Sequence, residues 1–289
     1  MNVHTVPTAR PDLELLRPVA VQDLVRLGRD RDGGYVVSRR AIEATRVLVG
    51  IGVNDEWSFE EAFLAAAPRT RLVLVDGTVG RAAYAWRALE RGARASRRLV
   101  RGHVRRARLA WCEARSYAAA WPRLEAFVAT DGRRLVQALI DRRDGRGRVS
   151  WETLHRDLDT PGRRRDLFVK MDVEGAEYDV LPAVLADGAQ LTGLALEFHR
   201  LDLNWGRLLE LRAAWDGEFA IAHVHGNNGD TLIPGTPVPK ALEVTLVARD
   251  LLTPEEAGRR IADPLPRPGL DFPNDPERPE FPLFVHAPG

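Results

Sequence analysis

LFVKMDVEGAEYDVL, residues Leu167–Leu181, is the stretch that decides the fold. A short apolar run ends at Asp172, the chain turns through Gly175, and it then restarts with the pattern of a helix. A carboxylate at a tight strand-to-helix turn is typical of open α/β sheets, whose ligands bind beyond the carboxyl ends of the strands. We therefore predict a buried strand over 167–172, a helix over 176–186, and a ligand site near Asp172.

The composition limits the classes of function. A chain of 289 residues can bury a full core. The net charge of +1 argues against nucleic acid as a partner, and the arginine-rich patches at 94–108 and 163–165 are interpreted as solvated faces. The single Cys112 excludes an internal disulfide and favours a reducing compartment. No apolar run approaches the ~18 residues of a membrane span, and the N-terminus lacks a signal segment, so we expect a cytoplasmic protein with no membrane partner.

Upstream of the opening stretch the chain reads as a βαβ unit. TRVLVGIG, Thr45–Gly52, is an apolar strand that ends in a G-x-G turn. The pattern Ser58-x-x-Glu61 fits a capping box and predicts the start of a helix. A further β run, Arg71–Asp76, again ends in a carboxylate, and a second helix is predicted to continue to Leu89. Strand, helix and strand within about 30 residues favour a parallel sheet.

Downstream, strands and helices continue to alternate. Two strands in succession at the end predict an antiparallel closing pair. The region 94–165 is rich in arginine and alanine and is the hardest to interpret; we predict a strand at Ala126–Thr130 with helices on either side. The other predicted elements are strands at 193–199, 218–225 and 241–248, a helix at 205–215 and a loop at 226–240.

The chain is predicted to have three parts. Residues 1–44 form an N-terminal extension, in which a helix over 12–28 is followed by two strands around the turn Asp32-Gly33-Gly34. That turn is either a plain hairpin or a ligand-facing loop. Residues 45–250 form the core. Residues 251–289 form a proline-rich tail, whose aromatic and leucine side chains predict packing on the core rather than disorder.

Gly50, Gly52 and Asp76 are the first candidate site. Glycines after the first strand of such a sheet let a cofactor approach the backbone, and an acid that ends the second strand can bind both hydroxyls of a ribose. A dinucleotide site needs a third glycine, but Val53-Asn54-Asp55-Glu56 follows here. Acids at that position would repel a pyrophosphate but tolerate a cationic sulfonium, so S-adenosylmethionine fits better than a nicotinamide dinucleotide.

Acidic and imidazole groups form the second candidate site. Glu174 and Glu177 are interpreted as helix N-terminal acids favoured by the helix dipole. Asp172 ends a strand that is buried on both faces and is a candidate for chemistry. Period-two alternation places Glu197 and His199 on one face of the next strand, and His199 is a candidate general base.

Two further observations bear on the second site. His223 and His225 lie on one strand face, about 6–7 Å apart from the rise per residue. With Asp172, Glu197 or His199 they could hold a divalent metal. Forty of the 42 Lys and Arg residues are arginine, yet a lysine, Lys170, directly precedes Met171-Asp172. An ammonium cannot be exchanged for a planar guanidinium in a tight site, so chance survival and a functional requirement both stay open.

The chain resembles the FkbM-type branch of S-adenosylmethionine-dependent methyltransferases. VKMDVEGAEYDVL, from residue 169, is similar to that family's K-(I/M)-D-(I/V)-E-G-A-E motif. RDRDGGYVV, VLVGIGVNDEWSFEEAF, LALEFHRLDLNW and HVHGNN…PKALEVTLV resemble segments of one subgroup, in this order, and cover most of residues 26–248. One departure is VGIGVNDEW, which replaces the common form D-(V/I)-G-A-N-x-G, and residues 94–150 carry no family motif.

The resemblance implies a Rossmann-like class I methyltransferase fold. This fold is a mostly parallel seven-stranded α/β sheet with an antiparallel last strand and helices on both faces. The resemblance also implies that S-adenosylmethionine lies over the first two strand ends, with Gly50, Gly52 and Asp76 as its contacts. Asn54, in the turn after Gly52, is predicted to bind the cofactor as well. The implied reaction is methylation of a hydroxyl on a sugar or another small natural product.

These inferences combine into one functional prediction, an O-methyltransferase with a small-molecule or carbohydrate acceptor. His199 is predicted to be the general base, and Asp172 to orient the acceptor or hold a divalent cation. Lys170 is predicted to act beside them or to support Asp172 structurally. Two alternatives stay open. One is a nicotinamide-dependent oxidoreductase, and the other is a non-catalytic binding module with a degenerate cofactor site, suggested by the VGIGVNDEW turn.

Overall fold

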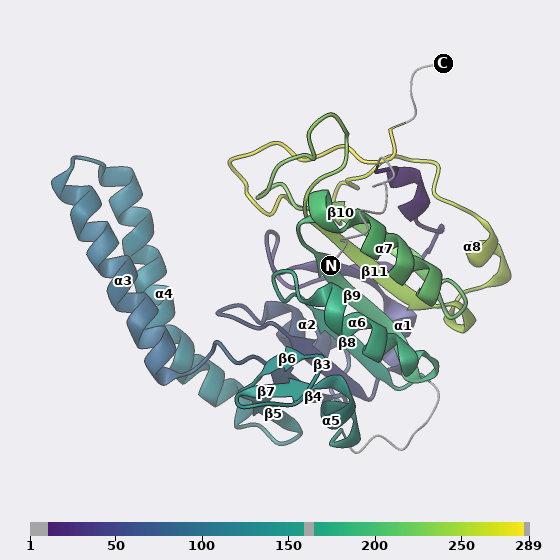
Figure 1. The fold of residues 1–289 in the computed structure, drawn as a ribbon, viewed down its shortest axis with the longest axis horizontal. Coiled ribbons are helices and arrows are strands. Elements are labelled where there is room, and N and C mark those ends of the chain that lie inside the picture. Colours follow the sequence, from purple (N-terminus) through teal and green to yellow (C-terminus); the bar gives the residue numbers. More distant parts are fainter. Residues whose placement is uncertain (1–10, 159–164, 286–289) are drawn as a thin grey trace, which may run out of the picture.

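The computed structural model describes residues 11–158 and 165–285, and a seven-stranded sheet forms its centre (Figure 1). Its strands are β3 (Val47–Ile51), β4 (Arg71–Val75), β5 (Arg133–Val136), β8 (Leu167–Met171), β9 (Leu191–Phe198), β10 (Phe219–Gly226) and β11 (Leu242–Ala248). Their order across the sheet is β10-β11-β9-β8-β3-β4-β5. The five strands from β9 to β5 are parallel, whereas β11 is antiparallel to both of its neighbours. The predicted sheet and its antiparallel closing pair are confirmed.

Helices cover both faces of the sheet, as predicted. The central strands β3, β8 and β9 are buried at every residue, because apolar side chains alternate to both faces and each face needs a cover. One face packs against α5 (Trp151–Arg156), α6 (Glu177–Ala186) and α7 (Leu201–Trp215). The other packs against α1 (Arg39–Ala44), α2 (Ser58–Ala66) and the hairpin of β1 (Leu24–Leu27) and β2 (Tyr35–Ser38).

The N-terminal extension corrects one prediction and confirms another. The helix predicted over 12–28 is wrong: only a 3-10 turn, η1 (Leu13–Leu16), forms there. Pro18 explains the stop, since the residue before a proline avoids helical backbone angles. After it the chain is extended, and Val19 pairs with Arg260 in an isolated bridge. The strands predicted around Asp32-Gly33-Gly34 are present as β1 and β2.

The start of α2 also differs from the prediction. No capping box forms at Ser58, which is the first helical residue and not the cap. Its backbone N–H instead donates to Glu56 Oε1 at 2.7 Å, and its hydroxyl accepts from the Arg29 backbone N–H at 3.1 Å. Glu61 accepts from the Trp57 ring nitrogen. The acid that caps α2 therefore lies two residues before the helix.

The region that was hardest to interpret is a long helical hairpin, here called the arm, formed by α3 (Arg81–Val100) and α4 (Val104–Val128). Figure 1 shows the arm projecting far from the sheet. The strand predicted at Ala126–Thr130 is wrong, because its apolar residues complete the last turns of α4. Phe127 stacks on Trp57 in the body, with ring centroids 6.3 Å apart. The first strand after α4 is β5, a few residues later.

The C-terminal residues lie over the polar end of the sheet. Leu265, Leu283 and Phe284 are buried in the same core as the sheet. Arg17 lies over the Phe284 ring and Arg26 over the Phe272 ring. The remaining short elements are β6 (Leu139–Asp141), β7 (Arg148–Ser150), η2 (Gly188–Gln190), η3 (Arg249–Leu251) and α8 (Pro254–Gly258). Within the described ranges, none of the helices combines the length and hydropathy that a membrane crossing requires.

Candidate functional site

A cleft of about 1090 Å³ opens at the carboxyl ends of β3, β4, β8 and β9. This is the edge where a sheet of this kind binds ligands. The structure brings most of the predicted site residues to this cleft, but Gly50, His223 and His225 do not line it. Asp32 and Gly33 of the β1–β2 turn line it too, so that turn is both a hairpin and a wall of the cleft. The predicted residues in the lining are Gly52, Asn54, Asp76, Lys170, Asp172, Glu197 and His199.

The two glycines of the G-x-G turn have different structural reasons. Gly52 has a φ of +80°, and a side chain there would collide with the backbone oxygen of Asp172. Its absence of a side chain lets the ends of β3 and β8 approach each other. Gly50 lies beneath the cleft, where a side chain would collide with the carboxylate of Glu60. Gly50 is therefore explained by packing against α2.

Asp76 is held by the backbone around it. It is 6 % exposed; its Oδ2 accepts from the Asn54 N–H at 2.8 Å and its Oδ1 from the Thr78 N–H at 2.6 Å. Each carboxylate oxygen keeps a further acceptor position for a ligand hydroxyl. The base of the arm fixes Asn54 in turn, because the Tyr84 hydroxyl donates to its carbonyl and Arg87 donates to its Oδ1 at 2.8 Å.

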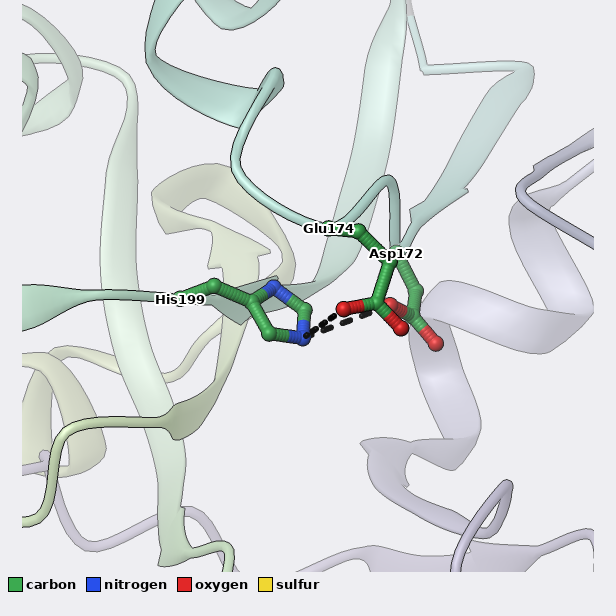
Figure 2. Close-up of side chains that lie close together, drawn as sticks. All are labelled: Asp172, Glu174 and His199. Carbon is green, nitrogen blue, oxygen red and sulfur yellow. Dashed lines mark ion pairs between the residues drawn. The ribbon is translucent and has the colours of Figure 1, made fainter. Parts of the chain in front are cut away.

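His199 is surrounded by carboxylates. Its Nδ1 lies 2.7 Å from Glu177 Oε1. Its Nε2 lies 3.8 Å from Asp172 Oδ1 and 3.7 Å from both Glu174 Oε2 and Glu197 Oε1. Figure 2 shows the carboxylates of Asp172 and Glu174 and this ring nitrogen converging on one space. The ring is thus oriented from behind by Glu177, while its Nε2 faces the cleft.

The surrounding charges change how these groups titrate. Burial opposes the imidazolium, but the hydrogen bond to Glu177 and the charges of Glu197 and Asp172 outweigh it and raise the pKa of His199 to about 9. Burial, together with Asp172 and Glu243, raises the pKa of Glu197 well above its usual range. His199 is therefore mainly protonated at neutral pH.

Lys170 is a buried cation under the cleft. Its ammonium donates to the Gly52 carbonyl at 2.9 Å and lies 3.7 Å from Asp172 Oδ2. It also lies 5.8 Å from the centre of the Tyr35 ring. Glu60 contributes a buried carboxyl group here, and its Oε1 has no hydrogen-bond partner among the described residues. Lys170 therefore ties the G-x-G turn to the end of β8.

Positive φ angles gather around the cleft. Asn54, Glu174 and Arg200 have φ of 46°, 54° and 53°, and they follow the ends of β3, β8 and β9. Such angles are unfavourable for residues with side chains, and they occur often at ligand sites. The loops at this edge are therefore shaped by requirements other than local backbone preference.

The structure does not bring the two strand histidines to the cleft residues proposed as metal ligands. His223 Nε2 lies 2.7 Å from Asp271. His225 lies 3.3 Å from Glu243 and 3.2 Å from Glu280. The group with metal-ligand spacing in the described residues is Asp172, Glu174 and His199, whose ligand atoms lie within 4.8 Å of one another.

Three contributors were not recognised from the sequence. Glu177 lies in the first turn of α6, as interpreted, but it is also fully buried and orients His199, 22 residues away. Glu60 and Tyr84 are the others. The apolar spacing of α2 gives no reason to expect that Glu60 is buried, and Tyr84 lies outside the sequence segments that resemble the family. These three residues contribute to the site only because strand ends that are distant in the sequence lie side by side, and the local sequence pattern does not show this.

The lining of the cleft is strongly acidic. It contains twelve aspartates and glutamates but only four lysines and arginines. The four are Arg29, Arg87, Arg148 and Lys170. Low-dielectric walls of one charge sign concentrate ligands of the opposite sign. The cleft is therefore suited to a ligand that carries positive charge.

Comparisons with known proteins give likenesses among solved structures, two of which are described here. No family model matches the chain, and no curated protein matches it either. It is similar to a precorrin-6y C5,15-methyltransferase from Geobacter metallireducens GS-15, with 12 % identity, 73 % of this chain and 88 % of that one covered, and a TM-score of 0.36. It is also similar to a mutant of the 16S rRNA (adenine(1408)-N(1))-methyltransferase from Catenulisporales acidiphilia, with 16 % identity, 80 % and 99 % covered, and a TM-score of 0.27. The order and directions of the strands, rather than these low scores, define the fold.

Proposed function

We propose that this protein is an FkbM-type, S-adenosylmethionine-dependent O-methyltransferase that acts on a hydroxyl of a sugar or another small natural product. The observation that carries the proposal is the acidic cleft at the carboxyl ends of β3, β4, β8 and β9, with Asp76 beside the Gly52 turn. The sheet has the strand directions that the family resemblance implies. Residues 45–250 would form the catalytic core, with the extension and tail as its cover.

The charge of the cleft favours S-adenosylmethionine over a dinucleotide. A pyrophosphate needs a free helix N-terminus, where backbone N–H groups bind it. In this chain the carboxylate of Glu56 already accepts from the Ser58 N–H at the start of α2. A cationic sulfonium with an ammonium tail is instead attracted by the carboxylates. Asp76 and Asn54 would hold its ribose and Gly52 would let it approach the backbone.

His199 is proposed as the general base. When bound, S-adenosylmethionine supplies a methyl group on a positively charged sulfur, and the acceptor hydroxyl gives up its proton as its oxygen becomes an ether. Nε2 of His199 would take that proton, while Glu177 holds the other ring nitrogen in place. Asp172 would orient the acceptor. Lys170 would position Asp172 and the Gly52 turn rather than touch the acceptor.

A divalent cation is the second candidate for the same space. Asp172, Glu174 and His199 offer two carboxylates and an imidazole, a donor set suited to manganese or zinc. A cation held there would lower the pKa of an acceptor hydroxyl. The two roles exclude each other for His199, because Nε2 cannot bind a metal and accept a proton at the same time. If activity survives chelation, the metal role is excluded and the general-base role of His199 is retained.

Ligand-induced stabilisation tests the cofactor class. At a concentration of 100 times Kd, a ligand stabilises the folded state by about 2.7 kcal/mol. We expect S-adenosylhomocysteine to raise the melting temperature and NADH to leave it unchanged, with the Asp76→Ala variant losing the effect. Stabilisation by NADH alone would instead support the oxidoreductase, and stabilisation by neither would support a non-catalytic module.

A further inference from the structure

The arm has a charge quite different from that of the whole chain. Residues 81–128 contain twelve arginines and three glutamates, whereas the complete chain has a net charge of +1. The three glutamates form ion pairs with Arg81, Arg91 and Arg94. Between Glu90 and Glu113 the chain has eight arginines and no acid. A positive charge of this density, gathered at one end of a projecting hairpin, fits an anionic partner.

The end of the arm is also apolar. Val100 is 88 % exposed, Val104 64 % and Leu99 52 %, and all three lie where α3 turns into α4 (Figure 1). These side chains stay exposed although Arg105, beside them, forms an ion pair with Glu277 of the tail. Around them stand Arg97, Arg98, Arg101 and Arg106, which form no ion pair with any described carboxylate. The end of the arm, residues 97–106, is here called the tip.

From this combination we propose that the tip docks onto an anionic lipid surface. Aliphatic side chains would enter the boundary between head groups and acyl chains, and the surrounding guanidinium groups would bind lipid phosphates. Such docking is separate from spanning a membrane, which none of the described helices could do. It is also independent of the chemistry proposed for the cleft.

Other occupants fit the tip less well. Single-stranded nucleic acid binds on aromatic stacking platforms, but the exposed apolar residues of the tip are valine and leucine, and the exposed Trp86 and Trp111 lie further along the arm. A second arm of the same charge would be repelled. The face between α3 and α4 is already filled by small residues, among them Ala95, Ala107 and Ala114, so no helix can insert there.

Binding of the full chain to vesicles tests the proposal. Sedimentation with vesicles of equal parts phosphatidylglycerol and phosphatidylcholine is compared with sedimentation with phosphatidylcholine alone. We expect binding only to the anionic vesicles. Each arginine near an anionic surface contributes about fivefold in affinity, so Arg97→Glu, Arg98→Glu and Arg101→Glu together should weaken binding at least a hundredfold. Val100→Ser with Val104→Ser should weaken it about tenfold.

The matched control reverses three exposed arginines of the body, Arg142, Arg143 and Arg146, by the same Arg→Glu change. It should bind like the unaltered protein. Circular dichroism and melting temperature verify that every variant is folded. Three results would each overturn the proposal. The control variant could lose as much binding as the tip variant, or the valine substitutions could leave binding unchanged. The protein could also be retained on a single-stranded RNA homopolymer but not on anionic vesicles.

Discussion

The cleft and the arm carry opposite charge within one chain. The cleft is lined by twelve acids and four permanent cations, while the arm has twelve arginines and three glutamates. Their sum nearly cancels, so the net charge of +1 conceals both. The net charge of a protein therefore indicates the charge of its binding partners only when the protein's own charges are evenly distributed over its surface. The two regions also differ in how they are formed. The cleft is a buried polar site whose residues come from strands distant in the sequence, whereas the arm is an exposed structure formed by one continuous segment.

The largest expected effect compares one glycine from each region. Gly52 and Gly102 have φ of +80° and +75°, but only Gly52 is crowded, by the Asp172 backbone. Gly102→Ala should cost about 1–2 kcal/mol for the left-handed backbone alone. Gly52→Ala adds a collision with backbone that cannot move cheaply and should cost more than 3 kcal/mol. Urea denaturation measures both; equal costs would show that the sheet edge tolerates a side chain there.

The next effect concerns catalysis and compares two histidines. His199→Gln should lower kcat between a hundredfold and ten-thousandfold, with the affinity for S-adenosylhomocysteine nearly unchanged. His103→Gln, at the exposed end of the arm, should change neither in a soluble assay.

The pH profile gives the sharper reading of His199. Because its pKa is raised to about 9, about one molecule in a hundred carries the neutral base at pH 7. The rate should rise about tenfold per pH unit up to about pH 9. A profile that is flat over this range, or equal losses of kcat and cofactor affinity in His199→Gln, would contradict the general-base role.

The smallest effect tests the polar layer under the tail. Burial opposes the charged ring, but Glu243 and Glu280 outweigh it and raise the pKa of His225 to about 10. Because the pKa of His225 is higher in the folded state than in the unfolded state, the charged ring stabilises the folded state. This stabilisation is complete at pH values below the unfolded pKa near 6.5 and is lost as the pH rises through about 10. The free energy of unfolding should therefore fall by roughly 2–4 kcal/mol between pH 7 and pH 10. For the His225→Gln variant, the free energy of unfolding should fall distinctly less over the same pH range. If both proteins lost stability in parallel with pH, the contribution assigned to His225 would be contradicted.

The sequence predicted the sheet better than the arm, for physical reasons. Strands such as β8 and β9 are mainly apolar runs between helices, so their pattern is strong. In the arm, α3 and α4 meet through alanines, whose apolar contribution is weak, and arginines hide the period. The run Ala126–Thr130 resembles a strand because Phe and Val are common in strands, but in the structure its first residues complete α4, and Phe127 packs on Trp57.

The residues of the candidate site that lie at the end of a single strand could be predicted from the sequence. Asp76, Asp172 and His199 each end or follow a recognisable strand, and all three line the cleft. Their partners could not be predicted, because Glu177 and Glu60 lie on helices whose positions depend on the whole fold. The titration of His199 could not be predicted for the same reason: it depends on Glu177, Glu197 and Asp172, which are contributed by a helix, a strand and a loop.

The arm also has a consequence for the order of folding. β4 and β5 pair in parallel although 57 residues separate Val75 from Arg133, and closing so long a flexible loop is entropically costly and slow. A helical hairpin has mostly local contacts, forms early, and returns the chain close to its starting point. With the hairpin formed, the ends of β4 and β5 are separated only by the short segments at its base. The arm would thus act as a kinetic shortcut, through which the edge strand joins the sheet without a long search.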